Sequence, residues 1–334
     1  MILASVIIPT RDRADVLARC LQSLERQTAA ADAFEVIVVD NGSRDHTRQT
    51  ALAFESRLRL RYLHAPEPGL HVGRHAGWKA ARADLLVFCD DDIEAEPSWV
   101  GGVIDAFADP RVGLVGGNCH PNFEAEPPPW LARWWNEPVG AGRALGYLSV
   151  LDFGHGRFDI DPSFVWGCNF SVRRAVLDAV GGFHPDGMPK DLMRFRGDGE
   201  SHVARAVRDQ GWRTLFSSEA SVHHQVSAGR MTPAYFEQRA FAQGVSDSYS
   251  AVRRCAGMPL PLAERLLQAL RPTARTLRER WRARATASDV VGAELLKVRL
   301  GTVRAWREGF NYHQSQLRTD RHLLEWVLKE SYLT

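Results

Sequence analysis

The stretch "ADLLVFCDDDIEAEPSW", residues 83–99, joins an apolar run directly to three consecutive aspartates. Its first part, "DLLVFCD" (84–90), predicts a short buried strand, because a brief apolar run bounded by polar residues is typical of strands that are covered on both faces. Adjacent carboxylates repel one another and raise each other's pKa unless a positive charge lies beside them. The stretch therefore predicts a buried strand whose carboxyl end binds a cation.

The residues before this strand alternate between strand and helix signals. Apolar runs and helical spacing of apolar residues predict strands at 5–10, 34–43 and 58–65, and helices at 14–27, 47–55 and 71–82. Alternation of this kind indicates a parallel sheet whose strands are joined by right-handed helical crossovers. The predicted fold class is α/β, with a Rossmann-like, mostly parallel sheet flanked by helices.

The acidic side chains lie where such a sheet binds its ligands. Asp40 closes the second predicted strand, and the trio Asp90, Asp91 and Asp92 closes the fourth. Ligands of parallel sheets lie beyond the carboxyl ends of the strands. Carboxylate oxygens select Mg²⁺, Mn²⁺ or Ca²⁺, and Mg²⁺ commonly takes one or two protein carboxylates together with substrate phosphates. The trio is therefore predicted to hold a metal ion that carries a diphosphate, and an exposed acidic turn that caps the next helix is the alternative.

Length and composition are those of a globular protein. The chain has 334 residues, of which 45% are hydrophobic and 25% charged, enough for one large domain or two ordinary ones. No run approaches the roughly 20 uninterrupted apolar residues that a membrane-spanning helix needs. The N-terminus shows no basic leader, so no secretory signal is expected, and five scattered cysteines without CxxC spacing favour a reducing compartment. The expected location is the cytoplasm.

Positive charge is concentrated towards the end of the chain. The formal net charge is only +2, but residues 253–334 carry 16 Lys and Arg against 8 Asp and Glu. Six arginines and one glutamate fall within "RPTARTLRERWRARA" (271–285). Such a segment fits either peripheral contact with the anionic inner face of the cytoplasmic membrane or a solvated helix face, and both interpretations stay open. Because no recognition motif accompanies the arginines, nucleic acid is not an expected partner.

The second half of the chain is less regular than the first. Residues 122–138, rich in proline and tryptophan, predict a long loop that covers a site. Trp130, Trp134 and Trp135 of this loop fit either an acceptor-binding wall or a partly buried hydrophobic cluster. Residues 231–334 show helical patterns separated by short loops, which predicts a helical C-terminal extension with a basic charge.

Five motifs, taken in their order and spacing, resemble those of the family 2 glycosyltransferases. They are "SVIIPTRDR", "FEVIVVDNGSRDHT", "GRHAGWKAARADLLVFCDDD", "WGCNFSVRRAVLDAVGGF" and "GDGE…GWR", and together they span about residues 3–230. Two later pieces, "GRMTPAYFEQRAFAQG" and "FNYHQSQLRTDRHLLEWVL", are similar to those of bacterial members that decorate lipids or polysaccharides. The resemblance implies a GT-A fold over residues 1–230, with residues 1–120 binding a nucleotide-sugar and residues 121–230 forming the acceptor and catalytic half.

The resemblance also implies an activity, namely metal-dependent, inverting glycosyl transfer with Mn²⁺ or Mg²⁺. The donor would be a UDP-, dTDP- or GDP-sugar. The acceptor would be a hydroxyl or amine of a glycan, a lipid-linked compound or a small molecule, in glycan or glycolipid biosynthesis. A sugar nucleotidyltransferase is one alternative, although "IIPTRDRAD" lacks the glycine-rich, lysine-bearing signature of those enzymes. The other is a non-catalytic nucleotide-binding scaffold, against which the intact Asp90, Asp92 and Asp198 argue.

The donor site follows from the resemblance residue by residue. Nucleotide-sugar contacts are implied for Pro9, Thr10, Arg13, Asp40, Asn41, Gly42, Arg74, Asp90 and Asp91. The carboxylate of Asp40 is suited to accept the imino N–H of a base, and a simple turn or helix N-cap is the alternative. Within the trio, Asp92 ranks first as metal ligand and Asp90 second. A histidine after the last core strand completes the metal shell, and the alternation in "ASVHHQ" favours His224 over His223.

Inverting displacement at an anomeric carbon also needs a base on the acceptor side. "GDGES" places Asp198 and Glu200 at a predicted helix start, where the family usually has a Glu-Asp pair followed by another acid. The match is incomplete, so Asp198 is the predicted base with Glu200 as the alternate, and helix N-terminal capping is the other interpretation of both. "WGCNF" is expected between donor and acceptor, with Trp166 stacking on a sugar, Asn169 hydrogen-bonding to it and Gly167 beside them. Core or turn roles are the alternative for these residues.

Overall fold

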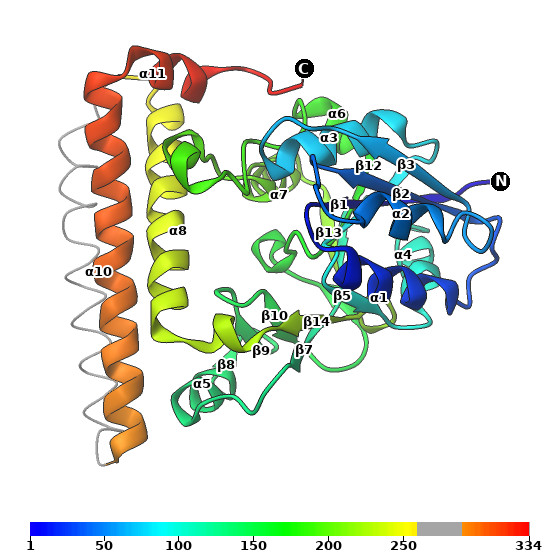
Figure 1. Ribbon diagram of the computed structural model, residues 1–334, viewed down its shortest axis with the longest axis horizontal. Coiled ribbons are helices and arrows are strands. Elements are labelled where there is room, and N and C mark those ends of the chain that lie inside the picture. The colour runs from blue at the N-terminus through cyan, green and yellow to red at the C-terminus, as the bar shows by residue number, and fades with distance from the viewer. Residues whose placement is uncertain (259–288, 334) are drawn as a thin grey trace.

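The computed structural model describes residues 1–258 and 289–333, and its centre is a sheet covered by helices on both faces (Figure 1). Eight of the described strands form this sheet, in the order β11-β13-β6-β12-β4-β1-β2-β3. They are β1 (Ala4–Thr10), β2 (Phe34–Asp40), β3 (Leu60–His64), β4 (Leu85–Cys89), β6 (Val112–Gly116), β11 (Arg157–Asp159), β12 (Asn169–Arg173) and β13 (Arg213–Ser217). Strand β1 is parallel to β2 and β4, and β12 runs antiparallel to its neighbours. The predicted mostly parallel α/β fold is confirmed.

Helices cover both faces of this sheet because its strands are apolar on both sides. The helices of the α/β part are α1 (Ala14–Glu25), α2 (Thr47–Leu52), α3 (Leu70–Ala80), α4 (Trp99–Ala106), α5 (Pro129–Trp135), α6 (Arg174–Ala179) and α7 (Glu200–Asp209). On one face Val6 and Ile8 of β1 share a core with α1, α2 and α4. On the other face Ile7 shares a core with α3, α6 and α7. Successive side chains of a strand point to opposite faces, so a strand buried on both sides is apolar throughout.

A second, smaller sheet takes most of its strands from the C-terminal half of the α/β part. Its described strands run in the order β5-β14-β7-β10-β9-β8. They are β5 (Ile93–Ala95), β7 (Cys119–Phe123), β8 (Pro138–Val139), β9 (Gly142–Leu145), β10 (Val150–Asp152) and β14 (Val222–Val226). Strand β5 directly follows Asp92, and β14 pairs antiparallel with it so that His224 lies opposite Ile93. This pairing brings β14 to the end of β4.

Residues 122–138 do not form the long loop that the sequence predicted. They include the end of β7 and helix α5, which has proline at its start, a position that favours helix initiation. Trp130 and Trp135 are buried in one hydrophobic cluster with Phe236 of the C-terminal extension. The hydrophobic-cluster interpretation therefore holds for these two tryptophans, whereas Trp134 is only half-buried.

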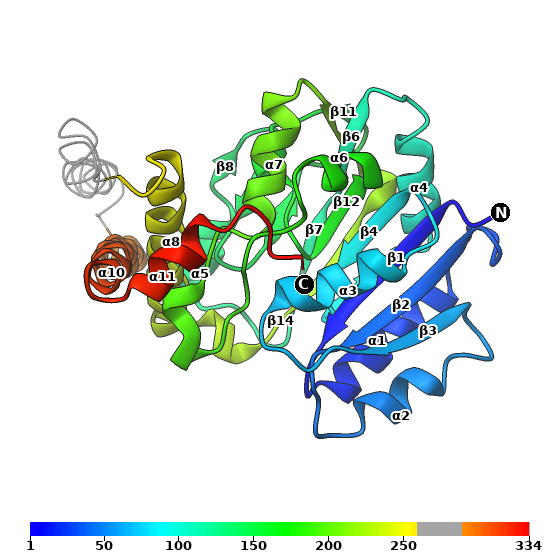
Figure 2. The ribbon, with the colours of Figure 1, turned by 90° about the horizontal axis from the view of Figure 1, so that it is seen from above.

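The C-terminal extension is built on two long helices that lie side by side at one edge of the molecule (Figures 1 and 2). Its helices are α8 (Pro233–Arg254), α10 (Val290–Thr319) and α11 (Arg321–Leu328). The backbones of α8 and α10 approach closely at two glycines. A Cβ on Gly244 would lie 2.0 Å from the carbonyl oxygen of Trp306, and a Cβ on Gly309 would lie 2.0 Å from that of Phe241. Only glycine allows this approach.

After α11 the chain returns to the α/β part and ends near α3 (Figure 2). The hydroxyl of Tyr332 lies 2.8 Å from that of Tyr249 on α8. The rings of Trp326 and Tyr332 both pack edge-on against His71 of α3. The extension thus contacts the α/β part through its C-terminal residues as well as along α8.

The composition led to expectations about the basic segment, about membrane-spanning helices and about the cysteines. The basic segment 271–285 lies outside the described residues. Among the helices that the structure does describe, none combines the length and the apolar character needed to cross a bilayer. The five cysteines are free thiols, and four of them are buried.

Candidate active site

The acidic trio lies at the carboxyl end of β4, in contact with arginines of the protein itself. The two ends of the Arg13 guanidinium bind Asp91 and Asp92, with N–O distances of 2.6 and 2.9 Å. Arg230, which follows β14, binds the same carboxylate of Asp92 at 2.9 Å. Asp91 and Asp92 are buried, whereas the side chain of Asp90 is 34% exposed. The guanidinium groups of Arg13 and Arg230 therefore neutralise part of the negative charge of the trio, which would be unfavourable at a buried strand end without them.

Three groups at this strand end are arranged as metal ligands would be. Asp90, Asp92 and His224 each offer one ligand atom, and these atoms all lie within 4.8 Å of one another. Nδ1 of His224 lies 2.9 Å from the carbonyl oxygen of Leu148, which orients the ring so that Nε2 faces Oδ1 of Asp92 at 3.3 Å. Apart from this contact with His224, that buried Oδ1 has no hydrogen-bond donor among the described residues. A hard divalent cation fits this oxygen-rich set.

The neighbouring histidine does not join this group. His223 is 43% exposed in its side chain and pairs with Glu96 at 2.5 Å. Alternate residues of β14 are buried, so His224 points to the acidic trio and His223 points away. The structure thus places the residue that alternation favoured beside Asp90 and Asp92.

Burial and neighbouring positive charges shift the pKa values of the trio in opposite directions. Burial raises the pKa of Asp91 to about 7, in spite of the charge of Arg13. Burial acts on Asp92 in the same direction, but the hydrogen bond and charge of His224, with Arg230, outweigh it and lower its pKa. The contact with Asp92 raises the pKa of His224 to about 9, although burial alone would lower it. Without a metal ion, the Asp92–His224 contact is therefore that of a carboxylate with an imidazolium, and a metal ion bound here would replace the proton on Nε2.

The expected nucleotide-binding residues converge on the same edge of the sheet. Thr10 pairs in register with Asp40 on β2, and its hydroxyl donates to Asp91 at 2.7 Å. One oxygen of Asp40 accepts from the backbone N–H of Ser43, and the other accepts from the hydroxyl of Tyr62, both at 2.7 Å. Burial and this bond raise the pKa of Tyr62 to about 12, so its proton stays available for Asp40. The carboxylate of Asp40 is held rigidly at the end of β2.

The loop after β2 is shaped by Asn41 and Gly42. The amide group of Asn41 donates to the carbonyls of Ala65 and Glu67, at 2.9 and 3.3 Å. Gly42 has φ +80°, a conformation that side chains other than glycine rarely adopt. Pro9 is buried at the end of β1 beside this loop. The structure therefore brings all the expected nucleotide-binding residues to one edge of the sheet, although Arg13 contacts the acidic trio.

Arg74 links the acidic trio to Glu200. Its side chain is almost fully buried, with Nη1 3.2 Å from Oε2 of Glu200 and Nη2 3.9 Å from Oδ1 of Asp90. The backbone N–H of Gly167 donates to the other oxygen of Glu200 at 3.3 Å. A Cβ at Gly167 would lie 2.1 Å from Nη2 of Arg74, so the guanidinium can occupy this place only because residue 167 is glycine.

Asp198 occupies a different environment from Glu200, and the structure contradicts the order in which the sequence ranked them. The side chain of Asp198 is 4% exposed and forms an ion pair with Arg205. It also lies 2.6 Å from Nδ1 of His184 and accepts from the hydroxyl of Ser250 at 2.6 Å. Burial would raise its pKa, but these partners lower it. Both oxygens are occupied inside the protein, and Asp198 does not line the cavity onto which Glu200 opens.

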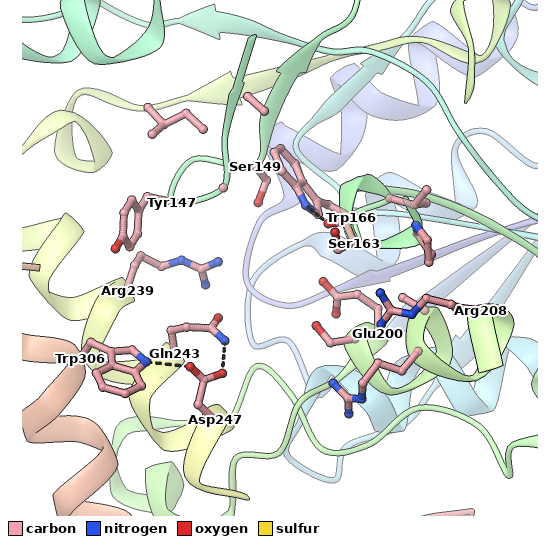
Figure 3. A pocket seen from close by; sticks show the side chains of 18 of the residues that line it. Tyr147, Ser149, Ser163, Trp166, Glu200, Arg208, Arg239, Gln243, Asp247 and Trp306 are labelled. Atoms are coloured by element: carbon pink, nitrogen blue, oxygen red, sulfur yellow. Dashed lines mark hydrogen bonds between the residues drawn. The ribbon is translucent and has the colours of Figure 1, made fainter. Parts of the chain in front are cut away.

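That cavity has a volume of about 680 Å³ and lies between the α/β part and the extension (Figure 3). Glu200 and Trp166 face it from the α/β side. The residues that face it from α8 and α10 are Arg239, Gln243, Asp247 and Trp306. The sequence reasoning missed these four residues and Arg230. The polar residues at 239, 243 and 247 recur every four positions, a spacing that places them on one face of a helix. This spacing could have predicted that α8 turns a polar face to a site.

Asn169 does not face the cavity as expected. It is 1% exposed, and its carbonyl oxygen accepts from the indole N–H of Trp99 at 3.0 Å. Its amide nitrogen donates to the backbone carbonyls of Ala220 and Asn118, at 2.8 and 3.4 Å. Both donors of the amide are therefore used inside the protein, which contradicts the expected hydrogen bond to a sugar.

Comparisons with known proteins agree with this geometry. The family described as Glycosyl transferase family 2 matches residues 5–181. Validoxylamine A glucosyltransferase of Streptomyces hygroscopicus subsp. jinggangensis is 34% identical over 200 residues, which are 55% of this chain and 47% of that protein. Glycosyltransferase AglE of Haloferax volcanii is 27% identical over 217 residues, which are 64% of each chain. The chain thus spans about half to two thirds of the length of these curated relatives.

A solved structure shares the fold over nearly the whole chain. It is the mannosyltransferase PcManGT from Pyrobaculum calidifontis in complex with GDP-Man and Mn2+, which matches with a TM-score of 0.54 and 21% identity. The match covers 94% of this chain and 86% of that chain. At this identity the likeness supports the fold alone.

Proposed function

This chain belongs to glycosyl transferase family 2, and on that premise we propose that it transfers a sugar, with inversion, from a nucleoside-diphosphate sugar to an acceptor hydroxyl or amine. The observation that carries the proposal is the connection from Asp90 through Arg74 to Glu200. It joins a strand end suited to a diphosphate with a carboxylate that opens onto a separate cavity. A transferase needs these two neighbouring sites, whereas a nucleotide-binding scaffold needs only the first.

On the donor side, the nucleotide lies at the edge formed by Thr10, Asp40 and Asn41. A divalent cation, Mn²⁺ or Mg²⁺, would be held by Asp90, Asp92 and His224. When bound, it supplies positive charge that stabilises the departing diphosphate. The arginines on the trio orient the same group by charge-assisted hydrogen bonds.

On the acceptor side, Glu200 is the base. Arg74 and the N–H of Gly167 fix its two oxygens, and the same carboxylate borders the cavity. Glu200 takes the proton of the acceptor hydroxyl while the acceptor oxygen bonds to the anomeric carbon and the bond from that carbon to the diphosphate breaks. Asp198 acts as a positioning residue, since its contacts with His184 and Ser250 hold the start of α7.

A donor screen tests this function. The protein is mixed with Mn²⁺ or Mg²⁺ and with UDP-, dTDP- and GDP-sugars, and the release of nucleoside diphosphate is measured together with the thermal shift of each donor. We expect one donor class to be turned over in a metal-dependent way, and Asp92→Asn to abolish turnover. Asp84→Asn is the matched control, because Asp84 lies at the other end of β4 and its side chain is 95% exposed.

The outcomes separate the alternatives. Donor binding without turnover in any metal would favour the nucleotide-binding scaffold. Formation of a sugar nucleotide from a nucleoside triphosphate and a sugar phosphate would favour the nucleotidyltransferase. The acceptor class (glycan, lipid-linked or small molecule) and the peripheral contact with the inner face of the membrane stay predictions from the sequence.

A further inference from the structure

The cavity beside Glu200 is lined by an arginine, Arg239, that has no hydrogen bond or ion pair with any residue that the structure describes. Arg239 of α8 is half-buried and faces the cavity (Figure 3). Within residues 1–258 and 289–333 it forms no hydrogen bond and no ion pair. Its positive charge helps to lower the pKa of Asp186, but the carboxylate of Asp186 is already paired with Arg196 at 2.6 Å. A half-buried guanidinium without an acceptor from the described protein is free to bind an anionic group that enters the cavity.

The two acids of the cavity already have other partners. Glu200 is bound by Arg74, as described above. Asp247 accepts from the indole N–H of Trp306 at 2.7 Å and from the amide of Gln243 at 2.8 Å. Both oxygens of Asp247 are therefore already hydrogen-bonded. These acids cannot provide the counter-charge.

Further arginines line the cavity on α7. Arg205 is paired with Asp198, whereas the side chain of Arg208 is 53% exposed and only 3.5 Å from an exposed carboxylate of Asp161. The described lining thus has arginines at 205, 208 and 239 against the two acids, which are already occupied. The field inside the cavity favours an anion and opposes a cation.

Aromatic side chains complete the walls. Trp134, Tyr147, Trp166 and Trp306 all border the cavity, and all four are half-buried. The indole N–H groups of Trp166 and Trp306 are already bonded within the protein, to Ser163 and Asp247 respectively. Their rings are therefore fixed as apolar surfaces, as in sites where a few polar groups orient a ligand between aromatic walls.

We propose that the acceptor is a saccharide bearing an oxyanion, a carboxylate or a phosphate, and that Arg239 binds this group while Glu200 takes the proton of the reacting hydroxyl. The inference rests on the proposed function, because it assumes that the cavity receives the acceptor. The donor diphosphate is not the anion concerned, since Asp90, Asp91 and Asp92 lie outside the described lining of the cavity. A guanidinium accepts either oxyanion through two parallel hydrogen bonds.

The test compares acceptors that differ in one substituent. Methyl glucoside, methyl glucuronoside, methyl glucoside 6-phosphate and methyl glucosaminide are offered with the donor found in the screen, and product formation is measured by mass. Binding of the same four compounds to the protein loaded with nucleoside diphosphate and Mn²⁺ is followed by ligand-observed NMR. The uronoside and the phosphate distinguish the two sources of negative charge. Arg239→Gln is the test variant, and Arg304→Gln, an exposed arginine on α10 outside the cavity, is the matched control.

We expect an anionic probe to be bound or glycosylated better than the neutral one, and the cationic one least well. Arg239→Gln should lower binding or kcat/KM for the anionic probe by about 10- to 100-fold, as loss of a charge-assisted hydrogen bond does, and by more than for the neutral probe. Arg304→Gln should change neither probe nor donor hydrolysis. If wild-type protein turns over donor but treats anionic and neutral probes alike in both assays, the inference is wrong and the proposed function stands. If no donor is turned over or bound, the proposed function itself fails. Equal effects of Arg239→Gln and Arg304→Gln would also overturn the inference.

Discussion

Replacing Glu200 by Gln and, separately, Asp198 by Asn should give opposite patterns of activity and stability. Gln at 200 keeps an oxygen for the N–H of Gly167, so the geometry is retained while the base is lost. We expect kcat to fall by about 10²- to 10⁴-fold. Glu200 is 23% exposed, and the buried Arg74 guanidinium that it leaves behind keeps Asp90 at 3.9 Å, so the free energy of unfolding should fall by about 1–2 kcal/mol.

Asn at 198 should act on stability instead. Donors from His184, Ser250 and Arg205 converge on the two oxygens of Asp198. An amide offers one oxygen, so its NH₂ group must face at least one of these donors. Removing one partner of a buried ion pair costs about 3–5 kcal/mol. Because the side chain of Arg205 is 42% exposed and can return to water, we expect about 2–3 kcal/mol.

The two effects are measured on the same samples. Urea unfolding gives the free energy of unfolding, and nucleoside diphosphate release gives kcat, corrected for the folded fraction. Asp209→Asn, an exposed carboxylate at the end of the same helix, serves as control and should change neither quantity. The assignment is refuted if Asp198→Asn abolishes turnover at unchanged stability while Glu200→Gln keeps kcat within about tenfold of the wild type.

Three further outcomes are expected. Gly167→Ala should displace Arg74, since its Cβ would lie 2.1 Å from that guanidinium, and lower kcat by about 10²-fold. Donor binding by thermal shift should weaken as well, because Arg74 also contacts Asp90, and an unaltered kcat would show that Arg74 is dispensable. Burial lowers the pKa of His75 to about 3 from its ordinary 6.5, so the unfolded chain binds a proton that the folded chain excludes, and stability is lost as pH falls below 6.5. Between pH 7.5 and 5 the drop in the free energy of unfolding should be about 2 kcal/mol smaller in His75→Gln than in the wild type, and equal slopes would contradict this. Gly309→Ala should cost about 1–3 kcal/mol in urea unfolding because it forces α8 and α10 apart, whereas Gly101→Ala, whose Cβ meets nothing within 4 Å, should not destabilise.

Residues at strand ends were predictable because topology alone fixes them. In a parallel sheet the carboxyl ends of neighbouring strands meet at one edge, so Asp40 and Asp90–Asp92 converge whatever their side chains contact. The alternation of side chains between the two faces of a strand is likewise independent of what each side chain contacts. This alternation was enough to distinguish His224 from His223. These inferences need only the order and direction of the strands.

The contacts of individual side chains were not predictable, because they depend on residues far away in sequence. Asp198 and Glu200 are two positions apart at the start of α7, and nothing local distinguishes them. Asp198 is directed inward by His184 and by Ser250, which lies 52 residues further along the chain. Arg13 was expected on the nucleotide, and its contacts with the acidic trio were not foreseen, since they arise where two buried carboxylates bind a nearby guanidinium.

In the proposed function, the extension contributes to the acceptor side of the site. Ser250 of α8 hydrogen-bonds Asp198, which holds the start of α7 and with it Glu200. The same helix presents Arg239 to the cavity, and α10 presents Trp306, whose position depends on the close approach at Gly244. The nucleotide edge, in contrast, is formed by β1, β2 and β4 and makes none of these contacts. Substitutions on α8 and α10 should therefore change which acceptor is used and how well Glu200 is placed, while donor binding at the carboxyl edge of the sheet stays as it is.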